Sequence, residues 1–460
     1  MEFRVVKDSL GEVEVPAGAL YGASTQRAVD NFPISGYRFG RRFIWALGLI
    51  KGSAASVSGV AGSLDPQVAS AIRQASDEVV AGEHDDQFVL DIFQTGSGTS
   101  TNTNANEVIA ARASQIIGKP GSIHPNDKVN YGQSSNDVIP TAIHLAAVAS
   151  IREDLMPALD KLAASLAAKA EEFTDVVKSG RTHLMDATPV TLGQEFGGYA
   201  TQVGKGAGRI ASVLPQLEEM ALGGTAVGTG INAPKGFAAD VIALMAERTG
   251  YPIREADDHF EAQGAKDAVV MASGALKTVA ASLFKIANDV RFLGSGPTSG
   301  LSEIRIPTLQ PGSSIMPGKV NPVMSEMLMQ VAAQVVGNDA AVTWGGANGN
   351  FELNVMMPVM AHNLLESIRL LSNAADAFRT RCVDGIEANT ERTSELVARN
   401  AIIVTALNPH IGYDNGARIA KEAVASGRSV RELVLEAGLM TEAELDAALD
   451  IKRMTEGGIL

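Results

Sequence analysis

The feature that most constrains the fold is one stretch in which apolar residues recur at every third or fourth position. With spacings of 3-4-3-4-3-4-3, these residues are Val269, Ala272, Leu276, Val279, Leu283, Ile286, Val290 and Leu293. The spacing places them on one face of an α-helix for more than three heptads, which is typical of helices that pack along their length. A helix over 266–293 would be roughly 42 Å long. The pattern predicts core packing in a bundle of long helices, long enough to be shared between subunits.

Other parts of the chain carry weaker periodic signals. Hydrophobic residues make up 45% of the 460 residues, so the chain can bury a substantial core. Alternating apolar residues on either side of 9–11 predict a β-hairpin over 1–15. Helices are expected at 41–60, 66–80, 104–117, 414–425, 429–437 and 441–450. Between 138 and 390 long helices dominate, with breaks expected at 178–189, 222–235, 294–322 and 344–350.

This organisation predicts a mainly α fold with three domains. We expect an N-terminal domain that is mixed but mostly helical (1–137), a central long-helix bundle domain (138–391) and a small C-terminal helical domain (392–460).

Composition excludes several classes of partner and cofactor. The 38 basic and 52 acidic residues give a net charge of −14 without any basic run, so neither nucleic acid nor an anionic membrane surface is an expected partner. The N-terminal residues lack the layout of a signal peptide, and no run of roughly 18 apolar residues occurs. Cys382 is the only cysteine, which excludes an intramolecular disulfide and a cysteine-held iron–sulfur cluster. We expect a soluble cytoplasmic protein with no metal and no cofactor.

Polar loops interrupt the helical pattern and point to anion binding. Their sequences are QTGSGTSTNTNANE (94–107), GQSSNDVIPT (132–141), KSGRTHLMDATPVTLGQE (178–195) and PGSSIMPGKVNP (311–322). Three of them carry helix-start signals: Asn136 or Asp137, Thr188 before Pro189, and Asn321 before Pro322. Because helix N-termini present unpaired N–H groups and a positive dipole end, such loops together could form an anion cradle. Taken singly, each also fits a structural turn or cap.

The side chains of these loops suit a dicarboxylate. Lys319 supplies the compact cation that a second carboxylate or an enediolate needs. Glycines and prolines around Ser313 and Ser314 describe a loop that closes over a ligand and expels water. Hydroxyls and amides that bind carboxylate oxygens without net charge come from Ser97, Thr99, Ser134, Ser135, Asn136, Thr182 and Asn321.

The segment GSSIMPGKVNP resembles the signature of the fumarase/aspartase superfamily, and with glycine before the lysine it resembles the class II fumarases. The resemblance extends over most of the chain. QTGSGTSTNTNANEV, QSSNDVIPTA, SGRTHLMDATPVTLGQE, ALGGTAVGTG and GSSIMPGKVNPV occur in the family's order and at compatible spacings. Such a set of motifs is highly specific.

The resemblance implies a fold, an assembly and a reaction. The fold is a three-domain, mostly helical subunit whose central domains form the helical core of a homotetramer, with active sites built from loops of three subunits. The reaction is the reversible hydration of fumarate to L-malate in the tricarboxylic acid cycle. It proceeds by anti addition or elimination of water through an aci-carboxylate intermediate, without iron or another metal.

The resemblance also implies residue roles. Ser313 would be the base, as an alkoxide held by loop N–H groups, with Lys319 close by; Ser314 is the alternative. His183 would be the acid-side group, acting through a water, and Glu326 the carboxylate that orients it. The substrate carboxylates would be bound by Ser97, Gly98, Thr99, Ser134, Ser135, Asn136, Thr182, Ser314, Lys319, Val320 and Asn321.

HPND (124–127) resembles the family's second, non-catalytic anion site, which would comprise His124, Pro125, Asn126 and Asp127. The same residues also make a good turn, and the preceding GSI (121–123) supplies no basic residue.

Two other functions fit the same fold. An aspartate ammonia-lyase shares the carboxylate cradle, but such relatives usually have PAKVNP where this chain has PGKVNP, and His183 also favours the hydratase. The second is a helical scaffold that has lost the chemistry; the presence of Ser313, His183, Lys319 and Glu326 argues against it.

Overall fold

The computed structural model describes residues 2–459 and is mainly helical, which confirms the predicted fold class. The sheets formed by these residues have two strands each. Their contacts divide the chain into two compact units, each made of three segments. Unit 1 comprises Met1–Pro157, Gly208–Ala280 and Ala333–Ser372, and unit 2 comprises Ala158–Ala207, Ala281–Ala332 and Asn373–Leu460. The division into three domains at 137 and 391 stays a prediction.

The predicted N-terminal hairpin is confirmed. Strands β1 (Phe3–Asp8) and β2 (Gly11–Pro16) pair antiparallel, with Phe3 opposite Pro16. The helices of unit 1 that follow are α1 (Ala23–Asn31), α2 (Arg41–Val60), α3 (Pro66–Ala81), α4 (Thr99–Ile116), α5 (Ser135–Ser150), α8 (Phe237–Thr249) and α9 (His259–Gly264). Its short strands are β5 (Glu219–Met220), β6 (Arg254–Glu255), β8 (Gly349–Asn350) and β9 (Leu353–Asn354).

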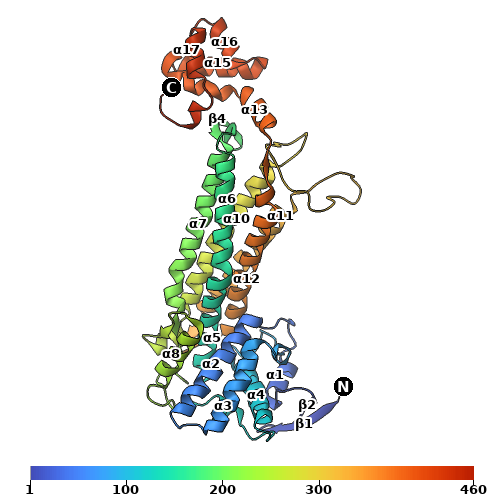
Figure 1. Cartoon of the computed structure of the whole chain (residues 1–460), viewed down its shortest axis with the longest axis vertical. Helices are drawn as coiled ribbons and strands as arrows, with labels where there is room; N and C mark the ends of the chain where they lie inside the picture. Colours follow the sequence, from blue (N-terminus) through green and yellow to red (C-terminus); the bar gives the residue numbers. More distant parts are fainter. Residues whose placement is uncertain (1, 460) are drawn as a thin grey trace. The chain divides into compact units, whose positions relative to one another are not determined.

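Helix α2 lies at the centre of this unit and packs against α3, α5 and α8 (Figure 1). Gly48 allows α3 to come close, because a Cβ there would lie 3.0 Å from the Ser76 carbonyl oxygen. Helix α4 begins at Thr99, five residues before the predicted start, because the Thr and Asn residues expected in a loop instead form its first turns.

Five long helices contribute residues to both units: α6 (Met156–Glu172), α7 (Leu192–Leu217), α10 (Asp267–Leu293), α11 (Val323–Gly346) and α12 (Met357–Arg381). Helix α10 confirms the predicted helix over 266–293 to within one residue at its start. All eight seam residues are at most 5% exposed, so the seam is core packing as predicted.

Unit 2 holds the hairpin of β3 (Val177–Thr182) and β4 (Met185–Thr191), and the pair β7 (Ile304–Arg305) and β10 (Glu387–Ala388). Its C-terminal helices are α13 (Thr390–Ala398), α14 (Asn408–Ile411), α15 (Tyr413–Ser426), α16 (Val430–Glu436) and α17 (Glu442–Ala448). The last three match the predicted short helices. They enclose an apolar cluster of their own, which includes Leu407, Ile419, Leu433 and Leu445.

The predicted helix starts in the polar loops are wrong in detail. Ser134, rather than Asn136 or Asp137, caps α5: its hydroxyl accepts the Asn136 N–H, and Asp137 closes the capping box. Thr188 and Pro189 lie in β4, because pairing with β3 extends the strand to Thr191.

The prediction for the third start is also wrong, because α11 begins at Val323 and the Asn321 side chain does not cap it. The Asn321 Nδ2 instead donates to the Gly312 carbonyl at 2.6 Å and closes the preceding loop. Tertiary pairing of this side chain therefore replaces the local cap.

Two helices, α2 and α10, are long and apolar enough to suit a membrane span, with mean hydropathies of 1.4 and 1.5. These mean hydropathies are averages over windows that also contain polar residues, so they agree with the absence of a continuous run of about 18 apolar residues. Helix α2 is mostly buried inside the chain, as the core helix of a soluble protein is.

Candidate active site

The predicted site residues fall into two groups, one in each unit. In unit 1 the loop before α4 and the start of α5 meet through hydroxyls. Thr99 Oγ1 hydrogen-bonds to Ser97 Oγ at 2.8 Å and to Ser135 Oγ at 2.7 Å. Gly98 has φ +73°, and a Cβ there would lie 2.9 Å from Ile139, so only glycine allows this approach. We call the group Ser97, Gly98, Thr99, Ser134, Ser135 and Asn136 the hydroxyl cradle.

A third segment, not assigned from the sequence, supports the hydroxyl cradle. Asn136 Nδ2 donates to the Ala226 carbonyl at 2.8 Å, and the buried Asp137 Oδ2 accepts the N–H groups of Gly223 (3.1 Å) and Thr225 (2.9 Å). Burial raises the pKa of Asp137, although these N–H groups favour its charged form. In the sequence this segment was marked by the motif ALGGTAVGTG, but the motif alone did not show that it contacts Asn136 and Asp137.

Thr225 in this segment has φ +53°, a conformation that costs a β-branched residue on the order of 1–3 kcal/mol. Asp137 holds its N–H, and Gln263 Nε2 donates to its carbonyl at 2.8 Å. The strain is therefore maintained by buried hydrogen bonds on both sides, which fixes the wall of the cradle next to Asn136.

In unit 2, Thr182 and His183 lie at the tip of the β3–β4 hairpin. Thr182 pairs with Met185, and the two residues between them, His183 and Leu184, have φ of +57° and +61°. Two positive φ values at the centre of a two-residue loop are typical of a type I′ turn, which usually takes Asn or Gly. His183 is exposed and, within residues 2–459, takes part in no hydrogen bond or ion pair.

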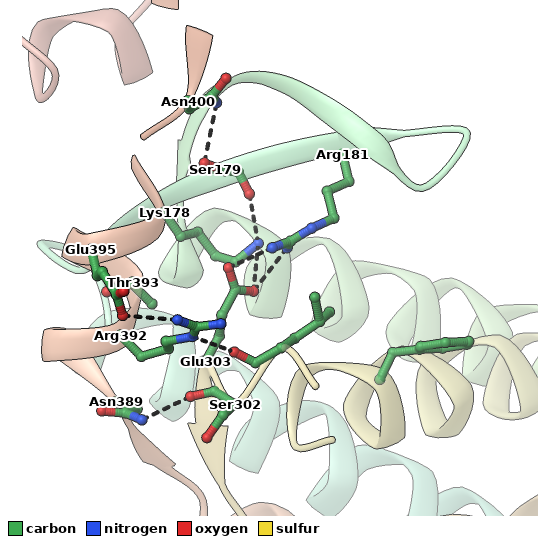
Figure 2. Close-up of polar contacts among 12 residues, drawn as sticks. Lys178, Ser179, Arg181, Ser302, Glu303, Asn389, Arg392, Thr393, Glu395 and Asn400 are labelled. Carbon is green, nitrogen blue, oxygen red and sulfur yellow. Dashed lines mark hydrogen bonds and ion pairs between the residues drawn. The ribbon is translucent and has the colours of Figure 1, made fainter. Parts of the chain in front are cut away.

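The base of this hairpin contains a buried cluster of charges (Figure 2). The fully buried Glu303 accepts two hydrogen bonds from Arg181, each 2.9 Å long, and lies 3.3 Å from Lys178 Nζ. Lys178 Nζ, also fully buried, lies 2.8 Å from Glu195, and burial raises the pKa of Glu195. Both cations of this loop, Lys178 and Arg181, are therefore paired with carboxylates of the same chain.

The same region joins the hairpin to Ser302 and Glu303, which precede the loop that carries Ser313 (Figure 2). Asn400 Nδ2 donates to Ser179 Oγ at 3.1 Å and to the Ala187 carbonyl at 2.8 Å, so it bridges both strands. Asn389 Nδ2 donates to the Ser302 carbonyl at 2.8 Å, next to Glu303. The hairpin and the segment at 302–303 are therefore held together by buried polar contacts.

The loop 311–322, between α10 and α11 (Figure 1), folds around Ser313. Ser313 Oγ accepts the N–H groups of Ile315 (3.2 Å) and Met316 (2.9 Å), the kind of donor pair that stabilises a negative oxygen. The Gly312 N–H donates to the Lys319 carbonyl at 2.8 Å and closes the loop. Gly318 has φ +80°, so this loop conformation favours glycine before the lysine.

The remaining predicted residues of unit 2 are accessible. Ser314, Lys319 and Val320 are exposed on the loop, and Glu326 is exposed in the first turn of α11. Within the described part of the chain, no hydrogen bond joins Glu326 to His183.

HPND forms a compact turn. Pro125–Val129 is a short π-helical segment, and His124 Nδ1 accepts the Asp127 N–H at 3.2 Å as its cap. In the neutral imidazole this nitrogen is therefore engaged in the turn. Within residues 2–459, no group of three or more His, Cys, Asp or Glu side chains is placed to hold a metal.

Comparisons with known proteins agree with this geometry. A family model described as "Lyase" matches residues 11–337, and one described as "Fumarase C C-terminus" matches 403–456. Fumarate hydratase class II of Corynebacterium glutamicum is 54% identical, with 98% of this chain and 96% of that protein covered. The protein of the same name from Halobacterium salinarum is 56% identical, with 100% and 98% covered.

Among solved structures, the class II fumarase of Schistosoma mansoni matches with a TM-score of 0.95 at 38% identity, and 99% of each chain is covered. Both the sequence and the fold are thus shared over almost the whole length. The chain belongs to the class II fumarate hydratase family.

Proposed function

We propose that this protein catalyses the reversible hydration of fumarate to L-malate, with Ser313 as the base. The observation that carries the assignment is the pair of backbone N–H groups that donate to Ser313 Oγ. A serine hydroxyl is a poor base in water, and its alkoxide needs such donors in a site from which water is excluded. Ser314 is exposed, and neither of these two donors points to it.

In the malate direction the Ser313 alkoxide takes a proton from the carbon next to one carboxylate, and the electron pair moves into that carboxylate to give an aci-carboxylate. The C–O bond on the neighbouring carbon then breaks. The leaving hydroxide receives a proton by way of a water held by His183, with Glu326 orienting the imidazole. Hydration of fumarate follows the same steps in reverse.

Substrate carboxylates are bound by the hydroxyl cradle on one side and by Thr182, Ser314, Lys319, Val320 and Asn321 on the other. The cradle offers hydroxyls and an amide in a fixed arrangement without net charge. Lys319 adds the positive charge that the aci-carboxylate needs.

We infer that the cradle, the His183 hairpin and the Ser313 loop of one active site come from three subunits of a homotetramer. Large apolar side chains are exposed on the long helices, including Phe284, Phe292 and Trp344, and exposed apolar surface is typical of an interface. A cytoplasmic role in the tricarboxylic acid cycle and a second anion site at His124–Asp127 belong to the same proposal.

The assembly can be tested by complementation. We would mix Ser313→Ala and His183→Asn proteins under conditions that exchange subunits. If the two residues serve one site from different subunits, mixed tetramers contain sites in which both are intact, and activity returns. If they act from the same chain, no mixture regains activity.

The reaction can be tested by proton NMR of purified, chelator-treated protein with fumarate, in samples with and without ammonium. Formation of L-malate in both samples and of no aspartate is expected. Aspartate that forms only with ammonium would show an aspartate ammonia-lyase. The absence of product in both samples would refute both activities, fumarate hydratase and aspartate ammonia-lyase.

A further inference from the structure

A fully buried lysine is bonded to the turn that precedes Ser134 of the hydroxyl cradle, although the reaction proposed above does not use it. Lys51 is the one basic residue in the middle of the apolar helix α2, and its side chain is 0% exposed. Burial of an ammonium group is costly unless hydrogen bonds compensate for the lost water. Such a residue is retained where its charge or its bonds are needed.

The ammonium of Lys51 bonds to two side chains of the turn before α5. Its Nζ donates to Asn130 Oδ1 at 2.8 Å and to Gln133 Oε1 at 3.0 Å. Gln133 directly precedes Ser134, the residue that caps α5. Lys51 is therefore bonded to the residue next to the cradle.

The turn also connects to the other helix of the cradle. Asn130 Oδ1 accepts Nδ2 of Asn102 (3.1 Å) and of Asn106 (3.2 Å), both from α4. The Asn102 N–H in turn donates to the carbonyl of Gly98. The Asn130 amide oxygen thus joins Lys51 to α4, and the Gln133 amide oxygen joins it to the start of α5.

We propose that Lys51 is a positioning residue for the dicarboxylate: it fixes the two helix starts of the hydroxyl cradle and places a positive charge close to it. The proposal rests on the function proposed above. It predicts that Lys51 stabilises the bound dianion equally in the ground state and in the transition state, so that it affects substrate binding and not the rate of the chemical step. Its loss should therefore raise KM and leave kcat nearly unchanged.

The charge of Lys51 depends on its surroundings. Burial lowers the pKa of Lys51 to about 7, and the charge of Asp137 on α5 opposes this shift.

Charged side chains on the other elements packed against α2 have different partners or are exposed. Arg248 of α8 pairs with Asp77 of α3, Glu107 of α4 accepts backbone N–H groups of residues 22–25, and Asp127 and Lys128 are exposed. Dicarboxylate binding should therefore weaken as the pH rises above 7.

The test compares Lys51→Met with Lys266→Met. Lys266 is a matched control because it is 2% exposed and has a pKa lowered to about 7 by burial, but among residues 2–459 its Nζ bonds to main-chain carbonyls alone, those of α9 and Ala265. For Lys51→Met we expect a KM for fumarate about tenfold higher, a change equivalent to about 1.4 kcal/mol, with kcat within about threefold. The rise in KM between pH 7 and 9 should disappear. Lys266→Met should keep the wild-type KM.

Succinate, an unreactive dicarboxylate, separates this proposal from the proposed reaction. The Kd of succinate, measured by calorimetry, should rise about tenfold in Lys51→Met whether or not the wild-type protein hydrates fumarate. Absence of fumarate hydration would refute the proposed reaction and leave the proposal for Lys51 standing. Unchanged KM and Kd in a folded Lys51→Met protein would overturn the proposal, as would equal changes in both lysine variants.

If Lys51→Met does not fold, Asn130→Asp provides the test. It places a carboxylate next to the ammonium and cancels its charge. A higher KM and a higher Kd for succinate, without loss of thermal stability, would support the electrostatic role. Wild-type binding by Asn130→Asp would refute it.

Discussion

Replacement of Glu303 by Gln tests how the base of the His183 hairpin is stabilised. The buried cluster contains two cations, Lys178 and Arg181, and two carboxylates, Glu195 and Glu303. The variant removes one negative charge where Glu303 and Lys178 are both fully buried. Lys178 keeps its bond to Glu195, but Arg181 loses its carboxylate partner and one of its two hydrogen bonds, because the amide NH2 is a donor where an acceptor is needed.

Removal of one partner from a buried ion pair typically costs about 3–5 kcal/mol, because the other charge stays buried without compensation. We expect a loss of this size in the free energy of unfolding of Glu303→Gln. We also expect a lower kcat/KM, since Arg181 directly precedes Thr182 and His183 in the hairpin.

Urea unfolding followed by far-UV circular dichroism, at one fixed protein concentration, measures this loss. Glu395→Gln is the matched control in the same region, because its carboxylate pairs with Arg392 at the surface and its loss should leave the unfolding midpoint unchanged. A loss below about 1 kcal/mol in Glu303→Gln would refute the reasoning, because it would mean that the unpaired guanidinium is rehydrated at little cost.

Four further perturbations have defined outcomes. Ser313→Ala should nearly abolish turnover while leaving the oligomer unchanged in light scattering; near-wild-type activity would refute the assignment of the base. Gly312→Ala would place a Cβ 2.3 Å from the Lys319 carbonyl oxygen. It should open the Ser313 loop and lower kcat with little change in melting temperature, whereas an unchanged kcat would show that the loop closes differently. Activity should survive exhaustive chelation and exposure to air, since Cys382 is the single cysteine; restoration of lost activity by iron would contradict this. Burial lowers the pKa of His144 to about 4, below its unfolded value, so stability should fall as the pH drops from 6.5 towards 4. The loss at pH 5 should be about 2 kcal/mol and absent in His144→Gln, as urea unfolding at pH 7 and 5 would show.

Features that depend on contiguous residues could be predicted from the sequence. The apolar seam from Val269 to Leu293 predicted α10, because a helix repeats its environment every 3.6 residues. The N-terminal hairpin and the short C-terminal helices followed from equally local patterns. The family followed from motifs whose order and spacing are themselves properties of the sequence.

The helix starts show where local patterns stop being sufficient. Thr188–Pro189 has the form of a cap followed by a first helical residue, but strand pairing placed it in β4. Asn321 has the same form, and its side chain closes the Ser313 loop instead. In both cases a partner elsewhere in the fold offered hydrogen bonds that outweighed a cap worth about 1 kcal/mol.

Which charged groups are available for chemistry follows from the three-dimensional packing. Lys178 and Arg181 lie in a polar loop of the sequence, and in the fold they pair with Glu303, which is 122 residues away from Arg181, inside the hairpin base. Lys51 lies in the apolar helix α2, and the fold bonds it to a turn some 80 residues away, at Asn130 and Gln133. Burial and charge compensation depend on residues that are distant in sequence, so periodicity and motifs do not encode them.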